Sequence, residues 1–169
     1  MDVTISPARP EQFASLHAIE LAAFETLRLA GAVTGQARAT SLEALREFSR
    51  HGLLLTACTS DSVPAGFVAG RVEDRWLHVA EIDVRPEYQR HGIGRQLLQA
   101  LLCVGQQRGL AGATLTTDSL AAFNARFYTT AGFTIVEGDA RPPHLAALIA
   151  DEIAEGFDPA RRVAMHLTF

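Results

Sequence analysis

One stretch decides the fold predicted for this chain: Val84-Arg85-Pro86-Glu87-Tyr88-Gln89-Arg90-His91-Gly92-Ile93-Gly94-Arg95. An apolar strand ends here, a short loop follows, and two glycines open a long helix. Because Gly92 and Gly94 lack Cβ atoms, a diphosphate can approach the backbone closely. The N–H groups and the positive dipole end of the helix would face that diphosphate, and Arg90 and Arg95 add positive charge. The stretch therefore predicts a phosphate cradle.

Two common phosphate cradles do not fit this stretch. A P-loop needs Gly-Lys-Ser/Thr, which the stretch lacks. A dinucleotide-binding fingerprint needs a third glycine at position 97, and that residue is Leu97. The alternative is that the stretch binds no phosphate and is only a glycine-rich start of a helix.

The chain on either side of the stretch alternates between strand and helix patterns. Strands are predicted near residues 3–5, 53–59, 67–72, 76–84, 114–117, 133–136 and 163–169. Helices are predicted near 10–30, 40–51, 91–108, 119–132 and 142–156, and Thr40 with Glu43 forms a capping box. This order indicates an α/β fold with a mixed sheet and helices on both faces.

The strand at 76–84 changes the parity of its apolar residues. Leu77 and Val79 occupy odd positions, whereas Ile82 and Val84 occupy even ones. If one face stays buried, an extra residue is needed near Ala80–Glu81, which is the pattern of a β-bulge whose backbone amides can bind a ligand carbonyl. If both faces are buried, the parity carries no meaning.

Two motifs together resemble the GNAT superfamily of N-acyltransferases. The coenzyme A pyrophosphate loop of that family, Gln/Arg-x-x-Gly-x-Gly/Ala, is matched by 89–94. The family's Tyr-x-x-x-Gly-Phe block is matched by Tyr128, Gly132 and Phe133. The order of the elements agrees over residues 1–137 and in the final strand. The resemblance implies a mostly antiparallel sheet with a splayed, bulged centre.

The resemblance also implies which residues bind acetyl-CoA. The backbone of Ile82, Asp83 and Val84 would bind the acetyl and pantetheine amides. The pyrophosphate would be held by the loop residues, which are Gln89, Arg90, His91, Gly92, Ile93, Gly94 and Arg95. Relatives often carry asparagine seven residues before the tyrosine, where this chain has Ala121; Asn124 lies four before it, as in a subset of relatives.

Three residues are candidates for proton transfer. Resemblance places Tyr128 beside the thioester sulfur, where it suits protonation of the departing thiolate. Glu81 is the first candidate for the base, because it is an acid in an otherwise apolar strand; the alternative is that it pairs with a structural arginine. His78, on the same strand, is the rival base, although a partly exposed strand histidine without a catalytic role is the simpler interpretation.

The function expected from this resemblance is acetyl transfer from acetyl-CoA to a primary amine by direct attack in a ternary complex. The acceptor is a small-molecule amine or a peptide or protein amine. The alternatives are a non-catalytic acyl-CoA-binding module, a transferase of another acyl group, or a nucleotide-binding protein of another fold. Homodimers are common among similar enzymes, which leaves a homodimer open here.

Composition limits the remaining functions of this chain of 169 residues, which is expected to be one domain, with an additional helix at about 143–156. The net charge of −4 argues against nucleic-acid binding. The sequence has no apolar run long enough to predict a membrane-spanning helix. Cys58 and Cys103 lie in apolar surroundings and predict reduced core cysteines of a cytoplasmic protein. The histidine and cysteine spacings match no metal motif, so no metal is expected.

Overall fold

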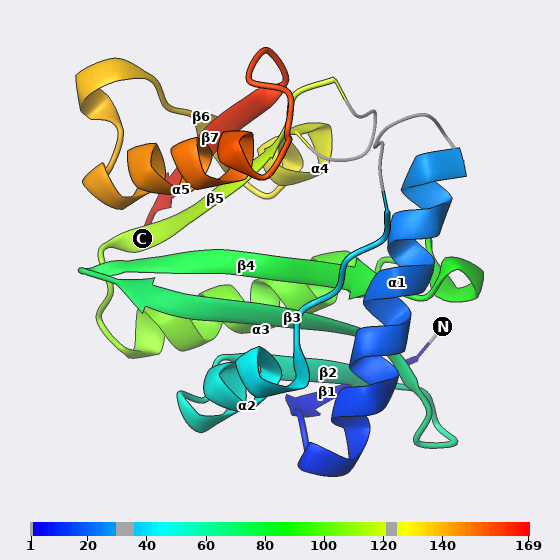
Figure 1. The fold of residues 1–169 in the computed structure, drawn as a ribbon. Coiled ribbons are helices and arrows are strands. Elements are labelled where there is room, and N and C mark those ends of the chain that lie inside the picture. Colours follow the sequence, from blue (N-terminus) through cyan, green and yellow to red (C-terminus); the bar gives the residue numbers. More distant parts are fainter. Residues whose placement is uncertain (1, 30–35, 121–124) are drawn as a thin grey trace. The chain divides into compact units, whose positions relative to one another are not determined.

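The computed structural model describes residues 2–29, 36–120 and 125–169 (Figure 1). The chain divides into two compact units. The first comprises Met1–Arg71 and Val79–Val104, and the second comprises Val72–His78 and Gly105–Phe169.

Seven strands form one sheet in the order β1-β2-β3-β4-β5-β7-β6. Antiparallel pairing joins β1 to β2, β2 to β3, β5 to β7 and β6 to β7, whereas β4 and β5 pair in parallel over Trp76–His78 and Gly112–Thr114. The predicted mixed, mostly antiparallel α/β sheet is thereby confirmed. A register shift is present between Ala57 and Cys58, and the bulge near Ala80–Glu81 stays a prediction.

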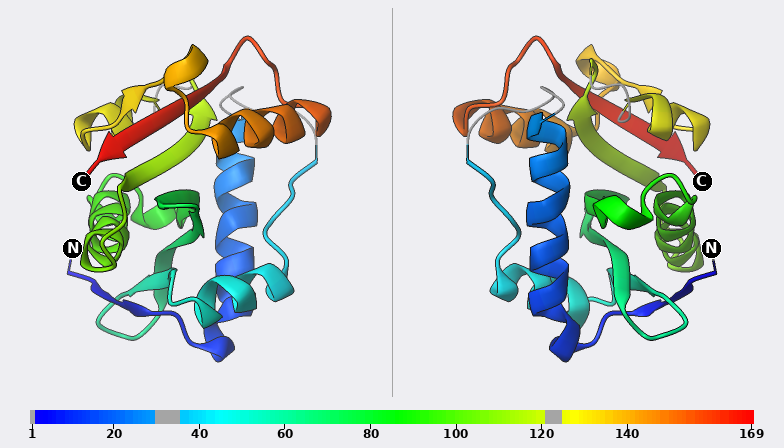
Figure 2. Two further views of the ribbon diagram at one scale, coloured as in Figure 1. Left: turned by 90° about the vertical axis from the view of Figure 1, so that its left-hand side faces the viewer. Right: turned by 90° about the vertical axis from the view of Figure 1, so that its right-hand side faces the viewer.

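The first unit places helices on both faces of its strands. Its elements are β1 (Thr4–Pro7), α1 (Phe13–Leu29), α2 (Leu42–Arg50), β2 (Leu54–Cys58), β3 (Pro64–Glu73), most of β4 (Trp76–Val84) and most of α3 (Ile93–Gln107). Figure 2 shows α1 and α3 on opposite sides of these strands. Short 3-10 turns, Pro10–Gln12 and Pro86–Tyr88, precede α1 and follow β4.

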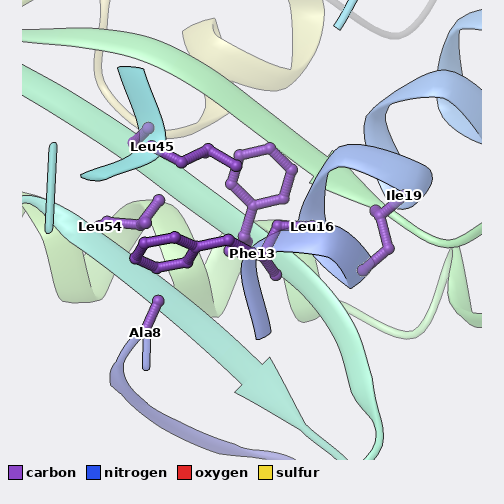
Figure 3. Close-up of a cluster of buried hydrophobic side chains, with 8 residues drawn as sticks. Ala8, Phe13, Leu16, Ile19, Leu45 and Leu54 are labelled. Atoms are coloured by element: carbon purple, nitrogen blue, oxygen red, sulfur yellow. The ribbon is translucent and has the colours of Figure 1, made fainter. Parts of the chain in front are cut away.

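The core under α1 follows from the spacing of its apolar residues. Phe13, Leu16 and Ile19 recur at helical intervals and are at most 4 % exposed. They pack with Leu45 of α2 and Leu54 of β2 (Figure 3). Burial of this apolar stripe fixes which side of α1 faces the sheet. Glu20, four residues after Leu16, lies on the same side and is also buried.

The second unit is built around β5 and β7. Its elements are β5 (Gly112–Asp118), α4 (Ala125–Thr130), β6 (Thr134–Ile135), a 3-10 turn (Gly138–Ala140), α5 (Pro143–Ala154) and β7 (Arg162–Thr168). Leu145, Leu148 and Ile149 of α5 pack against Val136 and Ala164. Helix α5 therefore packs on the sheet of its own unit.

Helix α2 begins one residue later than the capping-box pattern predicts. Ser41, not Thr40, is the N-cap, because the Ser41 side chain accepts a hydrogen bond from Ala44 N at 3.1 Å. Thr40 instead donates from its backbone N and its Oγ1 to Glu20 Oε1, at 2.9 and 3.1 Å. A contact with α1 thus replaces the local cap that the sequence predicts for Thr40.

The prediction of two buried cysteines is wrong for Cys103. Cys58 is half-buried and accepts a hydrogen bond from Gln12 Nε2, whereas Cys103 is exposed. The apolar residues Leu97, Leu98 and Leu101 occupy the buried face of α3, and position 103 falls on its outer face.

Among the described residues, no helix is long and apolar enough to cross a bilayer.

Candidate functional site

The loop from Gln89 to Arg95, named the basic loop from here on, joins β4 to α3 in the first unit. Gln89 Nε2 donates to the carbonyl oxygen of Val84 at 3.0 Å, which ties the start of the loop to the end of the strand. His91 Nδ1 lies 2.8 Å from the carbonyl oxygen of Gln89. Arg90 has a positive φ of 65°, so the backbone turns sharply there.

The start of α3 is open to a ligand. Gln96 N donates to the Gly92 carbonyl oxygen at 3.1 Å, so the N–H groups of residues 93–95 precede the first helical hydrogen bond. Gly92 has φ +79°, and a Cβ atom at this position would meet nothing within 4 Å. Within the basic loop Arg90 and Arg95 are exposed, whereas Ile93 is buried. A helix start with this charge and this open space fits a pyrophosphate.

Strand β4 carries the second part of the site. Glu81 and Asp83 are separated by one residue, and in a strand such residues share a face. Together with Glu20 of α1 they form a group in which one carboxylate oxygen from each residue lies within 4.8 Å of the others. This group is named the acidic cluster. Glu20 was not among the candidates that the sequence indicates.

Glu20 is held in place through one of its oxygens. Its side chain is 8 % exposed, and its Oε1 accepts the two hydrogen bonds from Thr40. His17 Nδ1 lies 2.9 Å from the carbonyl oxygen of the same threonine. Burial raises the pKa of Glu20, although the Thr40 hydrogen bonds and nearby His17 oppose that rise. The other oxygen, Oε2, is buried and has no hydrogen-bond partner among the described residues.

Asp83 lies in a comparable environment. Burial, and secondarily the charge of Glu20, raise the pKa of Asp83 from 3.8 to about 8. Its Oδ2 is also buried without a hydrogen-bond partner in the described part of the chain. The backbone here is tightly packed, because a Cβ atom on Gly66 would lie 2.6 Å from the Asp83 carbonyl oxygen. Two carboxylates of the acidic cluster thus resist ionisation when no cation is bound.

The rival base, His78, lies in the second unit and is buried rather than partly exposed. Its side chain is 4 % exposed because both faces of β4 are covered at residues 77–79. His78 Nδ1 lies 3.2 Å from Thr114 Oγ1, and His144 Nε2 lies 2.9 Å from the same hydroxyl. The expectation of a partly exposed histidine is therefore wrong, and the partner His144 on α5 could not be found from its spacing along the chain.

Tyr128 lies on α4 of the second unit. It is half-buried, and its ring packs edge-on against Phe127 and Phe133, with centroids 5.0 and 5.9 Å away. Gly132 has φ +95° and ends the helix, since Tyr128 O accepts from Ala131 N and Phe133 N around this turn. The Tyr-x-x-x-Gly-Phe spacing thus has a local structural cause.

Most of the predicted site residues are described by the structure. Ile82, Asp83, Val84 and the basic loop are continuous along the first unit. Asn124 lies outside the described residues.

Comparisons with known proteins agree with this architecture. Residues 14–133 match the profile of the Acetyltransferase (GNAT) family. Among solved structures, the chain is similar to the PaiA N-acetyltransferase from Thermoplasma acidophilum in complex with coenzyme A, at 17 % identity and a TM-score of 0.76, over 100 % of both chains.

Two further solved structures have the same fold. The ribosomal-protein-S18-alanine N-acetyltransferase from Escherichia coli is 22 % identical with a TM-score of 0.69, over 99 % of this chain and 94 % of that chain. Rv2747 from Mycobacterium tuberculosis, in complex with CoA, is 20 % identical with a TM-score of 0.68, over 98 % and 99 %. At these identities the similarity defines the fold.

Proposed function

Because the chain belongs to the acetyltransferase (GNAT) family, we propose that it transfers an acetyl group from acetyl-CoA to a primary amine by direct attack in a ternary complex. Acetyl-CoA is the acetyl donor of the family. The observation that carries the proposal for this chain is the basic loop, where an open helix start, a glycine without steric neighbours and two exposed arginines fit a pyrophosphate.

The residues of the first unit bind and orient the donor. The basic loop holds the pyrophosphate through backbone N–H groups and through Arg90 and Arg95. The backbone of Ile82, Asp83 and Val84 hydrogen-bonds the pantetheine amides and the acetyl carbonyl, as in the family that this chain resembles. When bound, acetyl-CoA supplies a thioester carbonyl that an amine can attack.

Proton transfer is assigned to side chains. An ammonium has no lone pair, so it must first lose a proton, and Glu81 accepts it directly or through water. A bond between the amine nitrogen and the acetyl carbon then forms, and the bond from that carbon to sulfur breaks. Tyr128 donates its phenolic proton to the departing thiolate. Of the two protons that the nitrogen gives up overall, one ends on sulfur and the other is released to solvent.

The test is acetyl-CoA-dependent thiol release against small amines, amino acids, aminoglycosides and short peptides. Release with one class of amine supports the transferase and names the acceptor chemistry. If coenzyme A binds but no amine in the panel causes release, the result points to a protein acceptor or to a non-catalytic acyl-CoA-binding module. If coenzyme A does not bind, the assignment of the basic loop is wrong as well.

A further inference from the structure

Without a ligand, the acidic cluster lowers the stability of the folded protein. A buried carboxylate oxygen that lacks a hydrogen-bond partner loses its hydration without compensation. Glu20 Oε2 and Asp83 Oδ2 are both in this state among the described residues, and both belong to the group of acids within 4.8 Å of one another. Glu20 is more than nine-tenths buried, so bulk water cannot screen this charge. A cation held by the three acids would compensate for this loss.

The spacing of the acidic cluster fits a primary ammonium group. An sp3 nitrogen donates three N–H bonds to charged oxygens at about 2.7–2.9 Å. Three acceptors around such a tetrahedral nitrogen are about 4.4–4.7 Å apart, and the three carboxylate oxygens here lie within 4.8 Å of one another. A primary ammonium among the three acids would therefore donate one N–H bond to an oxygen of each acid.

The position of the acidic cluster connects it to acetyl transfer. Glu81 and Asp83 flank Ile82 on β4, and the backbone of this segment is assigned to the thioester end of acetyl-CoA. Glu20 comes from α1, which shares the first unit with β4. An ammonium held by the acidic cluster is thus adjacent to the proposed base, Glu81.

The charge of the acidic cluster selects among amines. A protonated aliphatic amine gains from all three acids, whereas an aryl amine is uncharged at neutral pH and gains little. An α-amino acid carries a carboxylate on the carbon next to its ammonium, and like charges at this distance repel. The acidic cluster therefore discriminates against free amino acids.

We propose that Glu20, Glu81 and Asp83 bind the ammonium group of the acetyl acceptor, and that this acceptor is an aliphatic amine with no carboxylate on the adjacent carbon. This inference rests on the proposed transferase function and deepens it. Glu81 accepts the proton, while Glu20 and Asp83 bind the ammonium nitrogen directly.

The direct test is calorimetric titration of the full chain, alone and saturated with coenzyme A. The probes are 1,4-diaminobutane, norvaline and butylamine. Butylamine differs from norvaline only in the carboxylate next to the amine, and from the diamine only in the second amine, so it separates the two effects. Wild-type protein is expected to bind 1,4-diaminobutane at least about tenfold more tightly than norvaline. Glu20→Gln and Asp83→Asn, which keep shape but remove charge, are each expected to weaken that binding about tenfold or more.

Glu25→Gln is the matched control. Glu25 lies on the same helix, is 46 % exposed and pairs with Arg28 at the surface, so its loss is expected to leave diamine binding unchanged. In kinetic assays Glu20→Gln should raise KM for the diamine far more than it lowers kcat, which a merely structural role would not do.

Several outcomes would overturn the inference. The diamine does not bind to the protein, either alone or saturated with coenzyme A; or its affinity is unchanged in Glu20→Gln and Asp83→Asn; or norvaline binds as tightly as the diamine. Tight Ca²⁺ or Mg²⁺ binding that displaces the diamine would assign the acidic cluster to a metal instead. If an amine causes thiol release and its KM is unchanged in Glu20→Gln and Asp83→Asn, this inference is wrong but the transferase function stands. If diamine binding depends on the acidic cluster but no amine causes thiol release, the amine site stands and the transferase function is wrong.

Discussion

The basic loop and the acidic cluster lie in the same unit and are built in opposite ways. The basic loop is continuous in sequence, is largely exposed, and offers mainly backbone N–H groups. The acidic cluster joins Glu20 to Glu81 and Asp83, which lie 61 and 63 positions further along the chain. It contains one buried and two half-buried acids and offers only side-chain oxygens. A loop that binds an anion needs little support, because a helix start already carries its partial charge.

A site for a cation is harder to build. Like charges must be brought together and kept from water, and the fold must supply the energy for this. Here the hydrogen bonds from Thr40 hold one oxygen of Glu20, and close backbone packing at Gly66 fixes the strand that carries Asp83. Donor binding and acceptor binding should therefore respond separately to mutation.

The largest effect is expected for Glu81→Gln. Loss of the base should lower kcat by about 100-fold or more, while coenzyme A binding stays within about twofold because the basic loop is unchanged. The acidic limb of the pH–rate profile should also flatten. Steady-state kinetics across pH together with coenzyme A titration measure both.

A result opposite to this would exchange the two candidate bases. If the acidic limb persists in Glu81→Gln and disappears in His78→Ala, the histidine is the base. Because His78 is buried beside Thr114, the His78→Ala protein must first be shown to retain its unfolding temperature.

Tyr128→Phe separates chemistry from both kinds of binding. Loss of the phenolic proton donor should lower turnover about tenfold to 100-fold, with coenzyme A and amine affinities nearly unchanged. The edge-on ring contacts with Phe127 and Phe133 are kept by phenylalanine, so the fold should be intact. Unchanged turnover would remove Tyr128 as the acid.

A double substitution, Arg90→Ala with Arg95→Ala, should affect the donor side alone. Both side chains are exposed, so the loss of coenzyme A affinity is expected to be about tenfold, and the salt dependence of binding should become weaker. Diamine affinity should not change. Arg46→Ala, which removes an exposed arginine paired with Glu43 on α2, is the control. If diamine binding falls with coenzyme A binding, the two regions are not independent.

The smallest effect concerns stability. The pKa of Asp83 is raised from 3.8 to about 8, so between these pH values the folded protein holds a proton that the unfolded chain has lost. The stability of the wild type should thus fall as pH rises from about 4 to about 8. Asparagine cannot ionise, so Asp83→Asn should unfold a few degrees higher than wild type at about pH 8, and by less at about pH 5.

Thermal unfolding followed by circular dichroism at both pH values checks this prediction. Asp61→Asn, at an exposed turn, serves as the control and should show no such pH-dependent difference. Equal unfolding temperatures for wild type and Asp83→Asn across this range would mean that Asp83 ionises normally and that the acidic cluster is better solvated than its burial indicates.

Much of the fold could be predicted because its signals are local. Strand β4 occupies residues 76–84 as its apolar run predicts, and α3 begins within two residues of the predicted start at His91. The features that the sequence predicts wrongly depend on tertiary contacts. Thr40 does not cap α2 because it donates hydrogen bonds to Glu20 instead. The exposure of Cys103 depends on which face of α3 is buried, and the burial of His78 depends on side chains that cover both faces of β4.

The sequence by itself determined the basic loop. Two glycines, two arginines and the start of an apolar helix lie within a few residues, and hydrogen bonds and dipoles at a helix start depend only on neighbours along the chain. The tertiary structure alone decided the acidic cluster. The helical spacing puts Glu20 on the same side of α1 as Phe13 and Leu16, and puts the exposed Glu25 on the opposite side. Nothing along the chain shows that Glu81 and Asp83 lie beside Glu20, because that depends on which distant residues pack together.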